Sequence, residues 1–162
     1  MSGVTKHIFE HELDDILSMW NTEIKSVTPL LPRKYTKADI IALLKYYYPH
    51  EWQSVESKYK YYRTKDKYLK RRFGKSRYNM SEPELLIQRV SAFKKIFSES
   101  YKYAHWNAYS ERNRVDSSVK LWEARKYKID RINSKIEIAL SKTQQVTPSF
   151  INQLIGLYER KN

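Results

Sequence analysis

Apolar residues recur about every 3.6 positions along most of the chain, which predicts α-helices. The pattern is clearest in the segments 7–26, 36–48 and 49–73, where apolar side chains lie three and four residues apart. Thr36 stands where an N-cap is expected, and Pro49 suits the first turn of a helix. Only three glycines and five prolines interrupt the 162 residues, which is typical of a helical protein. The pattern therefore predicts an all-α fold.

The C-terminal half continues the helical pattern with fewer interruptions. Ser81 and Glu84 have the spacing of a capping box, and neither glycine nor proline occurs between Pro83 and Pro148. Apolar stripes predict long helices over 82–112 and 116–142, and a short helix over 148–160. We expect one domain, 1–162, forming a bundle of about six helices. The stripe from 115 to 140 would suit an internal core or a partner chain equally well, so the oligomeric state stays open.

Positive charge is concentrated in one segment of the chain. Lys and Arg number 31 against 18 Asp and Glu, a net charge of +13. The segment 58–78 holds ten of these bases, five tyrosines and one acid, Asp66, whereas residues 1–57 carry a net charge of −2. Basic charge gathered on one element and interleaved with aromatic residues is typical of a nucleic-acid-binding surface.

The helix predicted over 49–73 divides this segment into two faces. The inward stripe comprises Trp52, Val55, Tyr59, Tyr62, Leu69 and Phe73, with Asp66 in the vacant position, where Lys70 could pair with it. The candidate nucleic-acid-binding residues are Lys58, Lys60, Tyr61, Arg63, Lys65, Lys67, Tyr68, Lys70, Arg71, Arg72, Lys75, Arg77 and Tyr78. Of these, 74–78 would form a loose tail after Gly74 ends the helix. A second, weaker basic line comprises Arg125, Lys128, Arg131, Lys135 and Lys142.

These features predict a non-enzymatic nucleic-acid-binding protein whose partner is RNA or DNA, alone or within a nucleoprotein complex. Lysines and arginines would neutralise phosphates, and Tyr61 and Tyr68 would stack on unpaired bases. This arrangement favours RNA or single strands over duplex DNA. The alternative is a protein-interaction module, or a phage-type inhibitor, that docks the basic helix on a nucleic-acid-processing enzyme such as a CRISPR nuclease.

Patterns of catalytic or metal-binding residues are weak. The chain has no cysteine and no glycine-rich phosphate loop. His7 and His11 match an H-x-x-E-H zinc motif, which in a short chain with four histidines is better explained as a chance match. Asp14, Asp15 and Glu23 superficially match a metal-dependent nuclease core, but they fall on one amphipathic helix and are expected to be surface acids. We therefore predict no catalytic residue, metal or cofactor.

The sequence also bears on location. The N-terminal residues include no apolar signal segment, and no uncharged apolar run approaches the roughly 18 residues of a spanning helix. The lack of cysteine fits a reducing compartment. We expect a soluble, cytoplasmic protein with no membrane partner.

Overall fold

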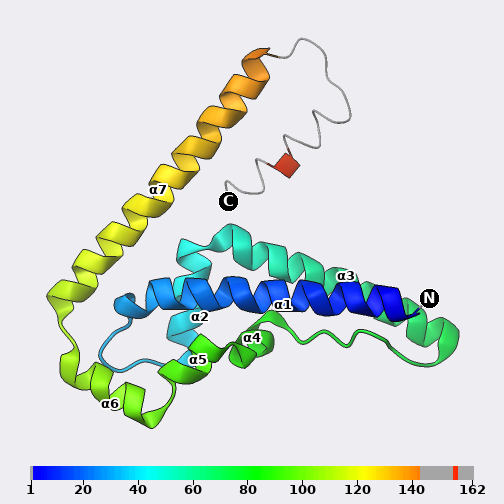
Figure 1. Ribbon diagram of the computed structural model, residues 1–162, viewed down its shortest axis with the longest axis horizontal. Helices are drawn as coiled ribbons and strands as arrows, with labels where there is room; N and C mark the ends of the chain where they lie inside the picture. The colour runs from blue at the N-terminus through cyan, green and yellow to red at the C-terminus, as the bar shows by residue number, and fades with distance from the viewer. Residues whose placement is uncertain (1, 143–154, 157–162) are drawn as a thin grey trace.

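The computed structural model describes residues 2–142 and 155–156, and these residues form helices without a strand (Figure 1). The all-α class predicted from the sequence is thereby confirmed for the described part of the chain. In chain order the elements are α1 (Ser2–Val27), the 3-10 helix η1 (Thr28–Leu30), α2 (Lys37–Tyr47), α3 (Pro49–Phe73), α4 (Pro83–Leu86), the 3-10 helix η2 (Ile87–Arg89), α5 (Ser91–Ile96), α6 (Glu99–Ala108) and α7 (Glu111–Lys142).

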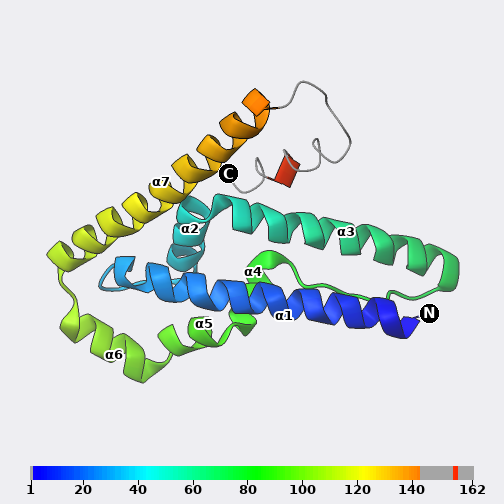
Figure 2. The same cartoon turned by 45° about the horizontal axis from the view of Figure 1, so that its top comes forward.

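Helices α1 and α3 lie side by side and run in opposite directions, as both views of the ribbon show (Figures 1 and 2). Two aromatic contacts join them. The rings of Phe9 and Tyr62 meet edge to face with centroids 4.6 Å apart, and those of Trp20 and Trp52 lie 5.4 Å apart. Such pairs add roughly 0.5–1.5 kcal/mol each beyond the burial of their area, so they help to fix the register of the two helices.

The main core lies where α1, α2 and the first half of α3 converge with the short helices that follow. Helix α1 contributes Ile16, Trp20, Ile24 and Val27 to this core, and their spacing places all four on one face of the helix. The other elements contribute Leu31, Tyr35, Ile40, Leu44, Trp52, Val55, Leu86, Ile87, Val90, Ala92, Phe93 and Ile96. Full burial of each large apolar side chain contributes about 1.5–3 kcal/mol, so this cluster is the main source of stability.

Local signals set both ends of α3. Pro49 occupies the first turn, where its missing N–H is not needed, and the helix spans the range predicted for it. Gly74 follows with φ of 84°, in the left-handed region, and its N–H donates to the carbonyl of Lys70 at 2.9 Å. Thr36 likewise caps α2, and its backbone N–H donates to Asp39 Oδ2 at 2.7 Å.

The single helix predicted over 82–112 is wrong. The structure divides this segment into α4, η2, α5 and α6, because Val90 and Ser98 adopt extended backbone with ψ of 132° and 147°. A straight helix would bury only one stripe, whereas the turns let neighbouring apolar residues from 86 to 96 all enter the core. Glu82, and not Ser81, is the N-cap of α4, without a side-chain cap bond, so the predicted capping box is also wrong.

The last helix, α7, leaves the bundle as a single long rod (Figures 1 and 2). It starts at Glu111, so the break expected between the helices over 82–112 and 116–142 instead falls at Tyr109 and Ser110. The helix packs against η1 and α2. Part of its apolar stripe stays half exposed, since Val115, Val119 and Trp122 retain between 46% and 50% of their accessible surface.

Two further predictions concern the chain as a whole. The helix expected over 148–160 lies outside the described residues except for 155 and 156. In the described part of the chain, no helix combines the length and apolar character needed to cross a lipid bilayer.

Candidate functional site

The structure places most of the predicted nucleic-acid-binding residues on the outer face of α3 and just beyond its end. Those with exposed side chains are Lys60, Tyr61, Arg63, Lys67, Tyr68, Lys70, Arg71, Arg72 and Lys75, and those that are partly buried are Lys58, Lys65 and Arg77. Lys65 Nζ lies 4.8 Å from the centroid of the Tyr61 ring, and Arg72 Nη1 donates to Tyr68 Oη at 3.0 Å. The exposed tyrosines are therefore already in contact with neighbouring cations.

Asp66 organises the segment that follows α3, instead of pairing with Lys70. Its carboxylate accepts the backbone N–H groups of Arg77 and Tyr78, both at 2.9 Å, and of Asn79 at 2.7 Å. Three N–H donors on one carboxylate hold the chain firmly as it returns along α3. The expectation of a loose tail at 74–78 is therefore wrong.

Tyr78 is not available at the surface. It retains 7% of its accessible area and packs between the rings of Phe9 and Tyr62, at centroid distances of 5.1 and 4.8 Å. It belongs to a small second core cluster. Phe73 shows the opposite error, because it was expected in the core and is 65% exposed.

The second basic line does not form a continuous surface with the first. Arg125 is buried against the start of α3, while Lys128, Arg131 and Lys135 are exposed along α7. The side chain of Lys142 lies outside the described part. Arg125 contacts the first turn of α3 and not its basic portion, so it does not join the two basic lines.

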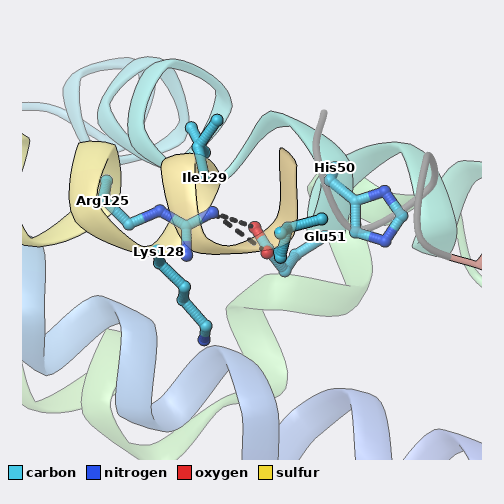
Figure 3. A pocket seen from close by; sticks show the side chains of 6 residues that line it. His50, Glu51, Arg125, Lys128 and Ile129 are labelled. Carbon is cyan, nitrogen blue, oxygen red and sulfur yellow. Dashed lines mark hydrogen bonds and ion pairs between the residues drawn. The ribbon is translucent and has the colours of Figure 1, made fainter. Parts of the chain in front are cut away.

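A polar pocket of about 350 Å³ opens where α7 meets the N-terminus of α3 (Figure 3). It is lined by His50, Glu51, Arg125, Lys128, Ile129 and Ile132. Helix α3 begins at Pro49, immediately before His50 and Glu51. The positive end of the α3 dipole therefore lies at the pocket. This brings together residues that are separated by about half of the chain.

Arg125 holds the two helices together at this pocket. Its Nε donates to the carbonyl of Tyr47 at 2.9 Å, and its Nη2 donates to the Glu51 carboxylate at 3.2 and 3.3 Å (Figure 3). The guanidinium also lies over the ring of Tyr48, 4.6 Å from the centroid. The charge of Arg125 is paired to Glu51, and the exposed Lys128 adds a second cation to the pocket wall.

Glu23 adds a buried carboxyl beside this pocket. It lies on α1 and retains 7% of its accessible area. Burial, and to a smaller extent the Glu51 carboxylate, raise its pKa to about 8 even though Arg125 and Lys128 act in the opposite direction. At neutral pH Glu23 is therefore mostly protonated and able to donate a hydrogen bond.

Glu23 was predicted to be a surface acid, and this prediction is wrong. The apolar stripe of α1 contained the missing signal, because Glu23 follows Trp20 by three residues and precedes Val27 by four. A polar residue within a buried stripe is the informative exception in an amphipathic helix.

The arrangement favours an anion over a metal ion. The start of α3, Arg125 and Lys128 supply positive potential, opposed mainly by Glu51. Among residues 2–142 and 155–156, no group of three or more His, Cys, Asp or Glu side chains is placed to hold a metal. His11 of the H-x-x-E-H motif instead lies 3.7 Å from Asp15, one turn further along α1.

The fold and pocket thus define an all-helical protein with a polar, net-positive pocket at a helix junction. No protein-family model matches the chain, and no solved structure matches it. Among curated proteins it is similar to the "Putative cyclic ADP-D-ribose synthase TIR2" of Cytobacillus dafuensis, with 26% identity over 161 residues. The match covers 99% of this chain and 42% of the relative, so the chain spans about two fifths of that protein's length.

This similarity contradicts the function predicted from the basic helix. A non-enzymatic, nucleic-acid-binding protein was expected, or a module docking on a nucleic-acid-processing enzyme. The relative is instead named as a synthase of cyclic ADP-D-ribose, which is an enzyme. The error arose because a basic, tyrosine-rich helix face indicates attraction for negative charge without identifying a function. Contacts between the α3 residues and any particular partner stay untested predictions.

Proposed function

We propose that the chain takes part in enzymatic synthesis of cyclic ADP-ribose, as the counterpart of the aligned two fifths of the relative. The observation that carries this proposal is the extent of the similarity, which covers 161 residues and nearly the whole of this chain. A cytoplasmic location, expected from the sequence, is part of the proposal because it would give access to NAD⁺.

The chemistry defines what such a protein must accomplish. Cyclisation of NAD⁺ forms a bond from an adenine nitrogen to the anomeric carbon of the nicotinamide ribose. The bond from that carbon to nicotinamide breaks, nicotinamide leaves with the electron pair, and the adenine gives up a proton. The protein must therefore hold a folded dinucleotide, neutralise its two phosphates, and stabilise positive charge on the ribose.

The described residues include groups of the types that this task needs. The pocket between α3 and α7 combines Lys128 with the start of a helix, which suits phosphate. The carboxylate of Glu51 and the protonated carboxyl of Glu23 lie beside it. These features support a role in dinucleotide chemistry. In this proposal the chain is one functional unit of a larger synthase-like protein.

A segment exchange tests the proposal. The aligned segment of the relative is replaced by this chain, and the chimera is incubated with NAD⁺ while cyclic ADP-ribose and nicotinamide are measured by liquid chromatography and mass spectrometry. We expect the chimera to form the cyclic product and a version lacking the segment to lose it. The 162-residue chain alone is assayed in parallel, and product there would place the reacting groups within it.

Two outcomes would contradict the proposal. One is a chimera that is folded, as judged by circular dichroism and a cooperative melt, but forms no cyclic product. The other is full activity in the version that lacks the segment, because the aligned region would then have no part in synthesis.

A further inference from the structure

We infer that the end of α3 docks this protein on the surface of a membrane that contains anionic lipids. This end, residues 67–75, is called the α3 tip below. The inference goes beyond the proposed function and does not rest on it. A membrane partner was not expected from the sequence because no segment is suited to span a bilayer, but binding at the surface needs no such segment.

The α3 tip projects from one extremity of the molecule. In both ribbon views the end of α3 extends beyond the start of α1, at one end of the long axis (Figures 1 and 2). After Gly74 the chain turns back, and Asp66 holds residues 77–79 through three backbone N–H groups. The tip is therefore a firmly held protrusion that can reach an extended surface ahead of the bundle behind it.

The α3 tip carries exposed positive charge without an acid to oppose it. Its five exposed cations are Lys67, Lys70, Arg71, Arg72 and Lys75. Within the part of the chain that the structure describes, no ion pair joins any of them to a carboxylate. Asp66, the nearest acid in the sequence, is buried, and its carboxylate accepts the three backbone N–H groups. The surface that complements this tip is therefore anionic.

Two aromatic rings are exposed among these cations. Phe73 retains 65% of its accessible surface, and Tyr68 retains 53%. Basic residues at the end of a helix complement the helix dipole, but the dipole does not account for an exposed phenylalanine. Phenylalanine and tyrosine enter the boundary between lipid headgroups and acyl chains, while lysine and arginine extend their charged ends to the headgroups. The α3 tip thus has both parts of a membrane-binding surface.

The directions of the cations favour a membrane over a nucleic acid or an acidic protein. Successive residues of an α-helix point about 100° apart, so Lys70, Arg71 and Arg72 extend to three different sides of α3. A nucleic-acid strand or a protein surface lying against one side would reach only part of them. Lipid headgroups can surround a tip that sinks among them, so all three side chains can reach a phosphate. Lysine is also depleted at protein interfaces, and three of the five cations are lysines.

Co-sedimentation of the full 162-residue chain with lipid vesicles tests the inference. The vesicles consist of phosphatidylcholine alone, or of phosphatidylcholine with about one third phosphatidylglycerol to supply negative charge. At about 0.1 M salt we expect the chain to bind the anionic vesicles at least tenfold more tightly than the neutral ones. At about 1 M salt the chain should be released, because the charges are then screened.

A triple charge reversal tests the cations of the tip. Lys67→Glu, Lys70→Glu and Arg71→Glu together should weaken binding to the anionic vesicles by about a hundredfold or more, because each basic residue near such a surface contributes about fivefold. All three side chains are exposed, so the variant should retain the circular dichroism and the cooperative melt of the unaltered chain.

A matched triple variant on α7 separates the tip from net charge. Lys126→Glu, Arg131→Glu and Lys135→Glu make the same change of charge at exposed positions away from the tip. If binding depends on the tip, this variant should weaken it by less than about tenfold, since only the long-range attraction is reduced.

Phe73 tests the apolar contact separately from the charge. Phe73→Ser should weaken binding to the anionic vesicles about fivefold or more, because the ring no longer enters the membrane boundary. Phe73→Leu keeps an apolar side chain and should bind within about twofold of the unaltered chain. The ring is exposed, so both variants should melt as the unaltered chain does.

The inference is overturned if the chain binds the two kinds of vesicle equally, if the two triple variants weaken binding equally, or if Phe73→Ser has no effect. A competition arm tests the choice of a membrane over the other polyanions. Displacement of the protein from anionic vesicles by single-stranded RNA or polyglutamate, at the same concentration of negative charge, would overturn that choice.

Discussion

Replacement of Glu23 by Gln should stabilise the folded chain, and by an amount that grows with pH. Glutamine keeps the size of the side chain but cannot ionise. The native carboxyl has a pKa of about 8 in the folded chain, against 4.5 for a glutamate exposed to water. Below pH 4.5 both folded and unfolded chains carry the proton, so ionisation costs nothing and the variant gains nothing.

The sign follows from proton uptake. Between pH 4.5 and about 8 the unfolded chain has released the proton and the folded chain retains it, so folding takes up a proton that becomes scarcer as pH rises. Each pH unit in this window lowers the stability of the native protein by about 1.4 kcal/mol. Above pH 8 the penalty is constant, because Glu23 then ionises in both states.

The full window sets a ceiling of roughly 5 kcal/mol for the difference between the two proteins. Relaxation of the structure and entry of water reduce such values, so we expect the variant to be about 2–4 kcal/mol more stable at pH 8.5. At pH 4.5 the two should agree within about 0.5 kcal/mol, and at pH 6.5 the difference should be intermediate. Other titrating groups are common to both proteins and cancel in the comparison.

The assay is urea unfolding followed by circular dichroism at these three pH values. Glu10→Gln, at an exposed position on the same helix, controls for the general effect of removing one negative charge. A difference that does not change with pH, or one that favours the native protein increasingly as pH rises, would refute the reasoning about the buried carboxyl.

Three further variants test contacts that position the site. Asp66→Ala removes the acceptor for three backbone N–H groups and should lower the free energy of unfolding in urea by about 3–5 kcal/mol. Asp66→Asn should recover part of this stability. A loss under about 1 kcal/mol in the alanine variant would show that the segment 77–79 does not depend on this carboxylate. Arg125→Ala leaves Glu51 without its ion pair and should lower the free energy of unfolding by about 2–4 kcal/mol. Amide hydrogen exchange in α7 should become faster. Unchanged exchange would contradict the role of Arg125 as the link between α7 and α3. Gly74→Ala should cost about 1 kcal/mol from backbone strain alone, since nothing lies within 4 Å of the added methyl group, and equal stability would contradict the assigned conformation.

Structural features that depend only on residues close together in the sequence could be predicted from it. The ends of α3 at Pro49 and Phe73 follow from a proline in the first turn and a glycine just after the last, and both signals act within one or two turns. Periodicity also placed Trp52, Val55 and Tyr62 in the core. It failed for Phe73 because α3 runs past the start of α1, so no helix covers that end (Figure 1).

The segment 82–112 shows a second limit. A continuous apolar pattern without glycine or proline indicates one helix as long as the segment is considered alone. Burial of Leu86, Ile87, Val90 and Phe93 against α1 outweighs the hydrogen bonds lost at each break, and that gain exists only once α1 is present.

The sequence by itself determined the helical class, the caps of α2 and α3, and the concentration of charge on α3. The tertiary structure alone decided that Glu51 and Arg125, from two separate helices, line one pocket, and that their charges act on Glu23 of a third helix. It also decided that Glu23 is buried and that Tyr78 is withdrawn from the surface. The physical reason is that caps and periodicity act over a few residues. The burial and the pKa of a side chain depend on groups that packing brings together from distant parts of the chain.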